Sequence, residues 1–460
     1  MATIVNTKLG ETKGLKRVWL QGEKLAREGY KPGDRLNVRV VEESLVVESC
    51  PTGKYTVSRK KKHLGLYQPV IDLTAAELTQ LFQGVEKLRV AIKRGTICIS
   101  AHHQQARINE REEKLINKLQ KNGALDVVSL FHGGGILDRS LHDGYQRAGI
   151  KTRLAMVSEI NKTYLDCSMR NNKAIWDEHT IAIEGPLQDV DLRGVNWTAS
   201  MVVAGLPCLG ASKSGRSKGK LQYAESHPEA GALFFNTLEV IKTFNPAMLW
   251  LEQVPEYLNT ASWQVVKSVL GSLGYRLEVT VMDGFEMGAL EKRRRMVCLG
   301  VSQGLVTGFD INKIKPIRKR EACIGSILED ISGDSPQWKP FKYLADKSVR
   351  DEKDKKGFRR QMLTPMSTHC GTIGRLYSKF RSTEPFVLHP TDKNKSRIFT
   401  SNEHARVKTI DPELVADESE TNANEILGQS VIKCVFEAAS AAHGESLSSE
   451  FGRSSALIAV

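Results

Sequence analysis

The sequence lacks the features that mark secreted, membrane-spanning and zinc-binding proteins. Its eight cysteines never fall in C-x-x-C spacing, which indicates neither a zinc site nor a disulfide framework. No apolar run approaches the length of a membrane span, and the first residues, MATIVNTKLGE, lack the apolar core of a signal peptide. We therefore expect a protein of the reducing cytoplasm, with no metal site and no membrane partner.

Acidic residues are also in short supply. The 66 lysines and arginines outnumber the 53 aspartates and glutamates, which gives a formal net charge of +13. This balance favours an anionic partner, nucleic acid first, although charge alone also fits a basic protein with no such partner. At 460 residues the chain is long enough for two or three domains with cores of their own.

Strands and helices alternate between residues 124 and 301. Apolar runs predict strands, and apolar residues at helical spacing lie between them. The expected strands are Leu125–Phe131, Leu154–Glu159, Met201–Ala204, Met248–Glu252, Tyr275–Met282 and Met296–Val301. Such alternation predicts an α/β fold with a doubly wound, mostly parallel sheet, whose ligands bind at the carboxyl ends of the strands.

A glycine-rich turn, FHGGG at residues 131–135, follows the first expected strand and opens the first helix. Glycines let the backbone approach a nucleotide-like ligand closely, and the amino end of the helix supplies free N–H groups. Glu159 ends the next strand, where a carboxylate can accept hydrogen bonds from ribose hydroxyls. Together these features favour a ribose-bearing cofactor over a purely structural turn.

Cys208 follows Pro207 directly after the expected strand Met201–Ala204, and a loop rich in Gly, Ser and Lys comes next. A thiol at the carboxyl end of a strand, beside a basic loop, suits a nucleophile that meets a polyanion. A lone Pro-Cys pair is more often inert packing, because reactivity requires thiolate character and exposure. The other motifs decide between these two interpretations.

Glu252 ends another strand in apolar surroundings, which raise the pKa of a carboxyl group toward neutrality, as a working acid requires. The alternative is a carboxylate that caps a loop. Arg293 and Arg295 alternate at the entry to the last expected strand, so they face the same side. They either bind phosphate, anchor Glu252, or belong to a solvated basic run.

In this order the motifs resemble those of the DNA C5-cytosine methyltransferase family. The matching segments are Phe131-x-Gly133-x-Gly135, Pro207-Cys208, Glu252-Gln253-Val254, Glu291-x-Arg293-x-Arg295, Arg397–Arg406 and Glu425–Val431. The resemblance implies the fold of S-adenosylmethionine-dependent methyltransferases, with S-adenosylmethionine as cofactor and double-stranded DNA as partner. It also implies a cytosine flipped out of the duplex as the substrate.

The resemblance assigns a role to each matching residue. Cys208 would add to C6 of cytosine, which makes C5 nucleophilic toward the sulfonium methyl group. Glu252 would offset the charge on the base, Arg295 would orient Glu252, and Arg293 would assist near the nucleophile. The implied cofactor-binding residues are Phe131, Gly133, Gly135, Glu159, Pro207, Leu233, Gln429 and Ser430.

The chain departs from the family pattern at four positions. Leu209 follows Cys208 where many members have glutamine. Gln253 stands where the family has asparagine, and Glu291 stands where it has glutamine. Pro186 occupies the place of an acid that usually contacts the adenine amino group, so that contact stays unassigned. None of these changes removes a catalytic group.

Outside the alternating region we expect further domains. Residues 1–58 are rich in β-strands, and 14–49 resemble the swapped-hairpin DNA-binding module of bacterial transition-state regulators, a plain β-hairpin subdomain being the alternative. Such a module implies a homodimer, because a swapped hairpin cannot bury its arms alone. The basic run at 58–63 is a linker or a phosphate contact, and the linker is favoured. The expected division is 1–58 for the β-rich module, 59–123 for a linker and helical region, 124–301 for the catalytic domain, 302–395 for a smaller target-recognition domain, 396–443 for the return of the catalytic domain and 444–460 for a disordered tail.

Three functions fit these motifs. The favoured one is a DNA (cytosine-5-)-methyltransferase that works in the cytoplasm, associated with the nucleoid, in a restriction-modification setting. The alternatives are a catalytically slow or idle DNA-binding protein and a tRNA cytosine-5 methyltransferase. Intact Cys208 and Glu252 argue against the idle protein, and the large region at 302–395 favours DNA over tRNA.

Overall fold

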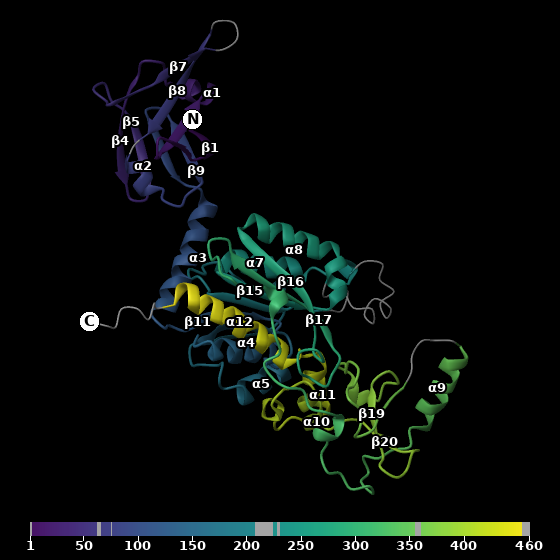
Figure 1. Ribbon diagram of the computed structural model, residues 1–460. Helices are drawn as coiled ribbons and strands as arrows, with labels where there is room; N and C mark the ends of the chain where they lie inside the picture. Colours follow the sequence, from purple (N-terminus) through teal and green to yellow (C-terminus); the bar gives the residue numbers. More distant parts are fainter. Residues whose placement is uncertain are drawn as a thin grey trace, which may run out of the picture. The chain divides into compact units, whose positions relative to one another are not determined.

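The computed structural model describes residues 2–61, 66–74, 76–207, 224–227, 231–354 and 360–452. The chain divides into two compact units, Met1–Glu110 and Arg111–Val460 (Figure 1). The expected nucleophile, Cys208, lies outside the described residues. Across the described ranges, none of the helices combines the length and apolarity that crossing a membrane needs.

The first unit consists of two antiparallel sheets around one core. Its strands are β1 (Ala2–Lys8), β2 (Gly10–Thr12), β3 (Leu15–Gln21), β4 (Arg35–Val41), β5 (Ser44–Ser49), β6 (Tyr55–Thr56), β7 (Ser58–Lys61), β8 (Tyr67–Thr74), β9 (Lys87–Lys93) and β10 (Thr96–Ala101). One sheet has the order β1-β9-β10-β5-β4-β6 and the other β2-β3-β8-β7. Alternate residues of both sheets, among them Val18, Leu88 and Ile97, face the core, as the two-residue period of a half-buried strand dictates.

The structure differs here from the expected division at residue 58. Strand β1 pairs with β9, β4 pairs with β6, and β3 pairs with β8, so strands from both sides of that position share the same sheets. Residues 59–101 are therefore half of this unit rather than a linker. Helix α1 (Glu23–Arg27) and helix α2 (Ala76–Leu81) are short, and α3 (His103–Gln120) follows the last strand.

The second unit is organised around a seven-stranded sheet of order β13-β12-β11-β14-β15-β17-β16. Its strands are β11 (Leu125–Leu130), β12 (Thr152–Glu159), β13 (Ile181–Glu184), β14 (Met201–Gly205), β15 (Met248–Gln253), β16 (Tyr275–Asp283) and β17 (Arg294–Ser302). Strand β17 runs antiparallel to both neighbours, and the other neighbouring pairs are parallel. All six expected strands are present, and the predicted α/β fold with a mostly parallel sheet is confirmed.

Helices cover both faces of this sheet (Figure 1). On one face, α4 (Ile136–Arg147) and α12 (Lys433–Phe451) pack against strand residues such as Met201 and Trp250. On the other face, α7 (Leu233–Phe244) and α8 (Ala261–Ser272) pack against strand residues such as Val202 and Leu249. Successive residues of a strand thus point into the cores on opposite faces of the sheet, which explains why these strands are continuous apolar runs.

Residues 302–395 contain little regular structure. They hold α9 (Lys342–Lys353), β18 (Gln361–Leu363) and β19 (Pro385–Leu388), and β20 (Ser396–Arg397) completes a three-stranded sheet with them. A separate apolar core, with Trp338 and Tyr377 at its centre, also takes in Phe399 and Val407. The sheet and the core both cross the boundary expected at residue 395.

The end of the chain returns to the catalytic sheet. Helix α10 (Ser401–Val407) and α11 (Glu420–Gln429) lead into α12, which packs closely along α4. A Cβ atom at Gly144 of α4 would lie 2.0 Å from Ser440 Oγ, so only glycine allows this approach. Helix α12 continues to Phe451, past the expected start of a disordered tail at residue 444.

Candidate active site at the carboxyl edge of the sheet

The parallel register brings the expected site residues to one edge of the sheet. Strands β11, β12, β14 and β15 are parallel neighbours or next neighbours, so their carboxyl ends share that edge. The glycine turn after Leu130, the carboxylate of Glu159, and Pro207 all follow these ends. Gly205 pairs with Glu252 across β14 and β15. The sequence prediction that ligands bind here agrees with this geometry.

The glycine turn takes a backbone shape that side chains resist. Phe131, Gly133 and Gly135 have φ values of 57°, 58° and 75°. The N–H of Gly133 donates to Glu159 Oε2 (2.6 Å), and the N–H of Asn161 donates to Glu159 Oε1 (2.8 Å), so the buried carboxylate is held against the turn. This arrangement joins the two parts of the expected cofactor site.

The last motif reaches the same turn. A Cβ atom at Gly133 would lie 4.0 Å from Gln429 Nε2, and one at Gly134 would collide with Ile426 Cγ2 at 2.4 Å. Helix α11 therefore covers the glycine turn, as expected for the segment that closes the pocket. Ser430 ends α11, and its hydroxyl donates to the carbonyl of Leu427 (2.7 Å).

A buried polar network supports the turn, and sequence reasoning missed it. His132 Nδ1 lies 2.8 Å from Asp138 Oδ2, and His132 Nε2 lies 2.8 Å from Ser168 Oγ. The hydroxyl of Ser129 also donates to Asp138 (2.8 Å). The available signal was the pair Ser129 and Asp138, polar residues at positions where the strand and helix patterns call for apolar ones.

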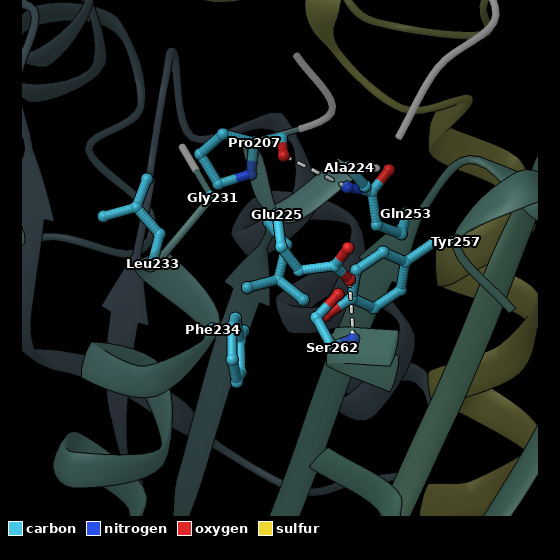
Figure 2. Close-up of a pocket in the computed structure, with 10 residues that line it drawn as sticks. Pro207, Ala224, Glu225, Gly231, Leu233, Phe234, Gln253, Tyr257 and Ser262 are labelled. Atoms are coloured by element: carbon cyan, nitrogen blue, oxygen red, sulfur yellow. Dashed lines mark hydrogen bonds between the residues drawn. The ribbon is translucent and has the colours of Figure 1, made fainter. Parts of the chain in front are cut away.

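A small pocket adjoins the segment that leads to Cys208 (Figure 2). Pro207, Leu233, Phe234 and Tyr257 line it, together with Gln253. The side-chain amide of Gln253 donates to the carbonyl of Pro207 (3.2 Å), and its carbonyl accepts from the N–H of Val254 (2.5 Å). Gln253 thus anchors the Pro-Cys segment, and Leu233 belongs to this pocket with Pro207.

Glu252 and Arg295 form an ion pair beside this segment. Arg295 Nε lies 2.8 Å from Glu252 Oε1, and the side chains are 16% and 13% exposed. Burial raises the pKa of Glu252 above its ordinary value, and the charges of Arg295 and Arg293 offset only part of that effect. The raised pKa makes this carboxyl group easier to protonate than an ordinary glutamate, and Arg295 fixes its orientation.

Arg293 lies nearby but is used differently. Its guanidinium donates to the carbonyls of Ile373 (3.0 Å) and Gly428 (3.2 Å), and it lies 3.5 Å from Glu291 Oε1. Gly428 itself has no room for a side chain, because a Cβ atom there would lie 2.3 Å from the carbonyl oxygen of Gly374. These contacts connect α11 to the 370–374 loop, which is a bracing role.

A second buried ion pair lies next to Arg293. Lys408 Nζ is 3.0 Å from Glu291 Oε2, and both side chains are fully buried. Burial and the charge of Arg293 lower the pKa of Lys408 to about 7, against the opposing effect of Glu291. Burial acts to raise the pKa of Glu291, but Lys408 and Arg293 together lower it below its ordinary value.

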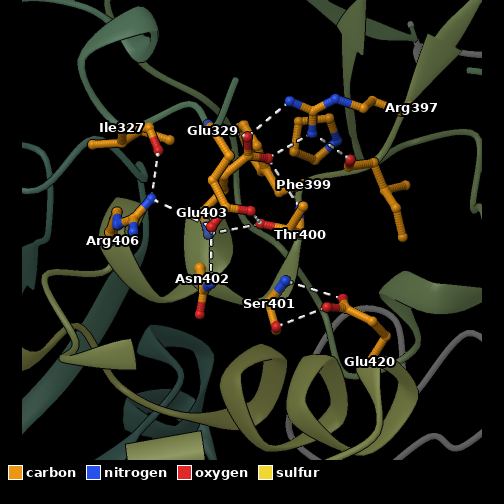
Figure 3. Close-up of polar contacts among 12 residues, drawn as sticks. Ile327, Glu329, Arg397, Phe399, Thr400, Ser401, Asn402, Glu403, Arg406 and Glu420 are labelled. Carbon is orange, nitrogen blue, oxygen red and sulfur yellow. Dashed lines mark hydrogen bonds and ion pairs between the residues drawn. The ribbon is translucent and has the colours of Figure 1, made fainter. Parts of the chain in front are cut away.

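The motif at 397–406 holds the return of the chain in place (Figure 3). Arg397 donates both terminal nitrogens to the carboxylate of Glu403 (2.6 and 2.8 Å). Glu403 also accepts from the N–H groups of Glu329 (2.8 Å) and Thr400 (3.0 Å), the second as part of a capping box that begins α10. One buried carboxylate therefore ties residues 329, 397 and 400 to the same helix.

Comparison with protein families and curated proteins gives a consistent result. The model of the family described as C-5 cytosine-specific DNA methylase matches residues 125–444. The Type II methyltransferase M1.ScrFI of Lactococcus lactis subsp. cremoris is 23% identical over 324 residues, which cover 68% of this chain and 76% of that protein. The Type II methyltransferase M.MspI of Moraxella sp is 26% identical over 241 residues, which cover 50% of this chain and 53% of that protein.

Solved structures share the fold. The S. pombe Dnmt2 methyltransferase has a TM-score of 0.54 at 18% identity, covering 68% of this chain and 96% of its own. The Entamoeba histolytica methyltransferase EhMeth has a TM-score of 0.54 at 18% identity, covering 71% of this chain and 98% of its own. At these identities the likeness concerns the fold alone.

Proposed function

Because the chain belongs to the C-5 cytosine-specific DNA methylase family, we propose that Cys208, Glu252 and Arg295 carry out its reaction. The chain is an S-adenosylmethionine-dependent DNA methyltransferase whose product is 5-methylcytosine. The family match does not favour the slow DNA-binding protein or the tRNA enzyme. The roles of individual residues are the proposal.

The residues at the glycine turn fit S-adenosylmethionine. Gly133 and Gly135 both turn with positive φ. A Cβ atom at Gly133 would meet only Gln429 Nε2 at 4.0 Å, so the backbone there is open to a ligand, whereas one at Gly135 would collide with the buried Ser168 at 2.6 Å, so Gly135 lets the turn pack on the protein. Glu159 offers a buried carboxylate for ribose hydroxyls, and Phe131 and Gln429 flank the turn. When bound, the cofactor supplies an electrophilic methyl group on a sulfonium centre.

Glu252 is the residue proposed to act as the acid. Burial raises its pKa and so favours proton sharing with ring atom N3 of cytosine, which would offset the charge that arises when the Cys208 thiolate adds to C6. Arg295 fixes the carboxyl group through its Nε, and Gln253 fixes the backbone before Cys208. Loss of the C5 proton and elimination of the thiolate then restore the aromatic ring. In this scheme Arg293 holds α11 against the 370–374 loop and takes no part in the chemical steps.

Substitution of the nucleophile tests the proposal. Cys208→Ser in the full chain should abolish methyl transfer to duplex DNA, because an alcohol is a far weaker nucleophile than a thiolate, and S-adenosylmethionine binding measured by calorimetry should persist. Cys50→Ser, which changes a cysteine of the first unit, is the matched control and should keep full activity. Activity above a few per cent in Cys208→Ser contradicts the assignment.

We also propose that the protein works on chromosomal DNA in the cytoplasm, associated with the nucleoid. Its DNA substrate and net charge of +13 support this location. Fluorescence imaging of a tagged chain tests it, since a signal spread evenly through the cell would contradict nucleoid association.

A further inference from the structure

The first unit is an internal duplicate. Its first half runs β1, β2, β3, α1, β4, β5, and its second half runs β6, β7, β8, α2, β9, β10. Every strand pairing has a counterpart when the halves are exchanged: β1 with β9 matches β6 with β4, β2 with β3 matches β7 with β8, and β4 with β5 matches β9 with β10. The pairs β3 with β8 and β5 with β10 join equivalent strands. The unit therefore has an approximate two-fold axis within one chain.

The buried residues repeat in step with the strands. Val18 and Ile71 are 53 residues apart, and Leu36 and Leu88 are 52 residues apart; all four are buried. The same offset relates many other core positions, including Leu25 and Leu78 in the two helices. Each half supplies equivalent apolar residues to one shared core.

This duplication removes the reason for a homodimer. The sequence prediction of a second copy assumed that swapped arms would stay unburied in a single chain. Here the arms β1 and β6 pair with β9 and β4 of the opposite half. The two halves complete one another, so the unit needs no second chain.

The two halves differ in one hairpin. In the first half, β2 reads Gly-Glu-Thr, Lys16 pairs with Glu11 (3.1 Å), and Arg17 pairs with Asp72 (2.7 Å). Lys16 and Arg17 of this hairpin are therefore neutralised by carboxylates.

The equivalent strand β7 of the second half reads Ser-Arg-Lys-Lys and is exposed at all four positions. Among the described residues, no acidic side chain forms an ion pair with Arg59, Lys60 or Lys61. A row of cations on an edge strand can simply prevent edge-to-edge pairing. That reason does not account for the aromatic rings beside it.

Two exposed aromatic side chains flank the cations. The guanidinium of Arg59 lies 4.9 Å from the ring centre of Tyr67, which is 53% exposed. Gln21 Oε1 accepts from both Lys60 Nζ (3.1 Å) and Trp19 Nε1 (3.1 Å), so it holds the ammonium beside an indole that is 39% exposed. The cations match the phosphates of a nucleic-acid backbone, and the neighbouring ring of Tyr67 and amide of Gln21 hold Arg59 and Lys60 in place.

We propose that the β7 strand with Trp19 and Tyr67 is a contact surface for the backbone of duplex DNA, carried by a unit that is complete in a single chain. The charge balance supports this partner, since residues 1–110 contain 19 lysines and arginines and 11 acidic residues. The surface reads charge and carries no base-specific code. It adds a second DNA contact to the chain, independent of the chemistry proposed for Cys208.

A charge reversal tests this surface in the full chain. The triple variant Arg59→Glu, Lys60→Glu, Lys61→Glu should bind a 30-base-pair duplex at least about tenfold more weakly near 0.1 M salt in fluorescence anisotropy. The slope of log K against log salt should fall by about 2 to 3, because each lost phosphate contact contributes roughly 0.9. The control Lys151→Glu, Lys173→Glu, Lys267→Glu makes the same change of charge on exposed positions of the second unit and should keep the slope.

Further measurements separate the outcomes. Equal affinity and slope in the two triple variants would overturn the proposal, and so would a selective loss of single-stranded RNA binding. The charge-conserving variant Arg59→Lys, Lys60→Arg, Lys61→Arg should bind the duplex as tightly as the unaltered chain. A melting temperature of the charge-reversal variant equal to that of the unaltered chain verifies its fold.

If the charge-reversal variant does not fold, Lys61→Gln alone should still lower the salt slope by about 1, and an unchanged slope counts against the surface. Sedimentation should give a monomer, whereas a stable dimer would refute the single-chain unit. Methyl transfer at saturating DNA should be retained, which distinguishes this failure from failure of the active-site proposal.

Discussion

Glu252 and Glu291 are two carboxylates shielded from water, each beside an arginine at the entry to β17, and their pKa values move in opposite directions. Glu252 has one close cation, Arg295, and burial raises its pKa. Glu291 lies beside Lys408 and Arg293, and its pKa is lowered although it is the more deeply buried. Burial acts to raise both pKa values; the charges around Glu291 outweigh that effect, and those around Glu252 offset only part of it.

The difference separates a reacting group from a structural one. Glu252 keeps 13% of its side chain exposed at the edge where substrate arrives, and it can exchange a proton there. Glu291 is fully enclosed, stays ionised and joins segments around residues 373 and 408. Substitution by glutamine should therefore lower the rate of methyl transfer at Glu252 and the stability of the fold at Glu291.

The largest expected effect concerns the rate of methyl transfer. Glu252→Gln should lower kcat by about 10³-fold, since a positioned acid contributes 10² to 10⁴-fold. Glu291→Gln should change kcat by less than about threefold, because Glu291 does not touch the reacting atoms. Single-turnover assays with labelled cofactor measure both. Similar losses in the two variants would break the distinction.

The next effect concerns stability. Glu291→Gln should lower the free energy of unfolding by about 3 kcal/mol, because it leaves the buried Lys408 without its carboxylate. The double variant Glu291→Gln, Lys408→Met should recover most of this loss, since replacing both members of a buried pair costs little. Urea titration gives the values. No recovery in the double variant would show that the pair does not act as a unit.

Arg293 and Arg295 should differ in the same way, the first in its effect on stability and the second in its effect on kcat. Arg293→Lys loses its donors to the carbonyls of Ile373 and Gly428 and should destabilise the fold by about 2 kcal/mol with kcat nearly unchanged. Arg295→Lys should lower kcat by about tenfold with little change in stability, because only the orientation of Glu252 suffers. The reverse pattern would assign the catalytic role to Arg293.

The smallest effect is the pH dependence of stability, where the two carboxylates have opposite signs. The folded pKa of Glu291 lies below 4.5, so its stabilisation is present above that pH and is lost as pH falls through the folded value. The folded pKa of Glu252 lies above 4.5, so stability falls as pH rises through that higher value. Glu252→Gln should remove the contribution of Glu252 to this second slope and leave that of Glu384, whose pKa burial raises to about 7. Unfolding titrations between pH 3 and 8 check this.

Much of the second unit was predictable from local pattern. Parallel strands buried on both faces are continuous apolar runs, and six of the seven were located to within a few residues. β13 was missed because Ile181–Glu184 is a short strand, largely exposed, with no apolar run around it. The site residues at strand ends followed from the parallel order, since consecutive βα units place those ends together.

What escaped prediction depends on partners distant in sequence. Lys408 follows a helix whose last turn is basic, so nothing local shows that it meets Glu291 in the core. The network of His132 with Asp138 and Ser168 likewise joins residues from three elements. The duplication in the first unit was not seen in the sequence because its halves share few identical residues, although they share the spacing of their apolar residues.

The seam between α4 and α12 has a consequence for how the protein is made. The Tyr145 hydroxyl accepts a hydrogen bond from Trp250 Nε1 (3.0 Å) and shares another with Nδ1 of His443 (2.8 Å), a residue 298 positions further on. A ribosome must therefore add the 298 residues from Tyr145 to His443 before this contact can form. Until α12 has been made, the apolar side of α4 lacks this partner, so the nascent polypeptide exposes a hydrophobic surface of the kind that chaperones bind.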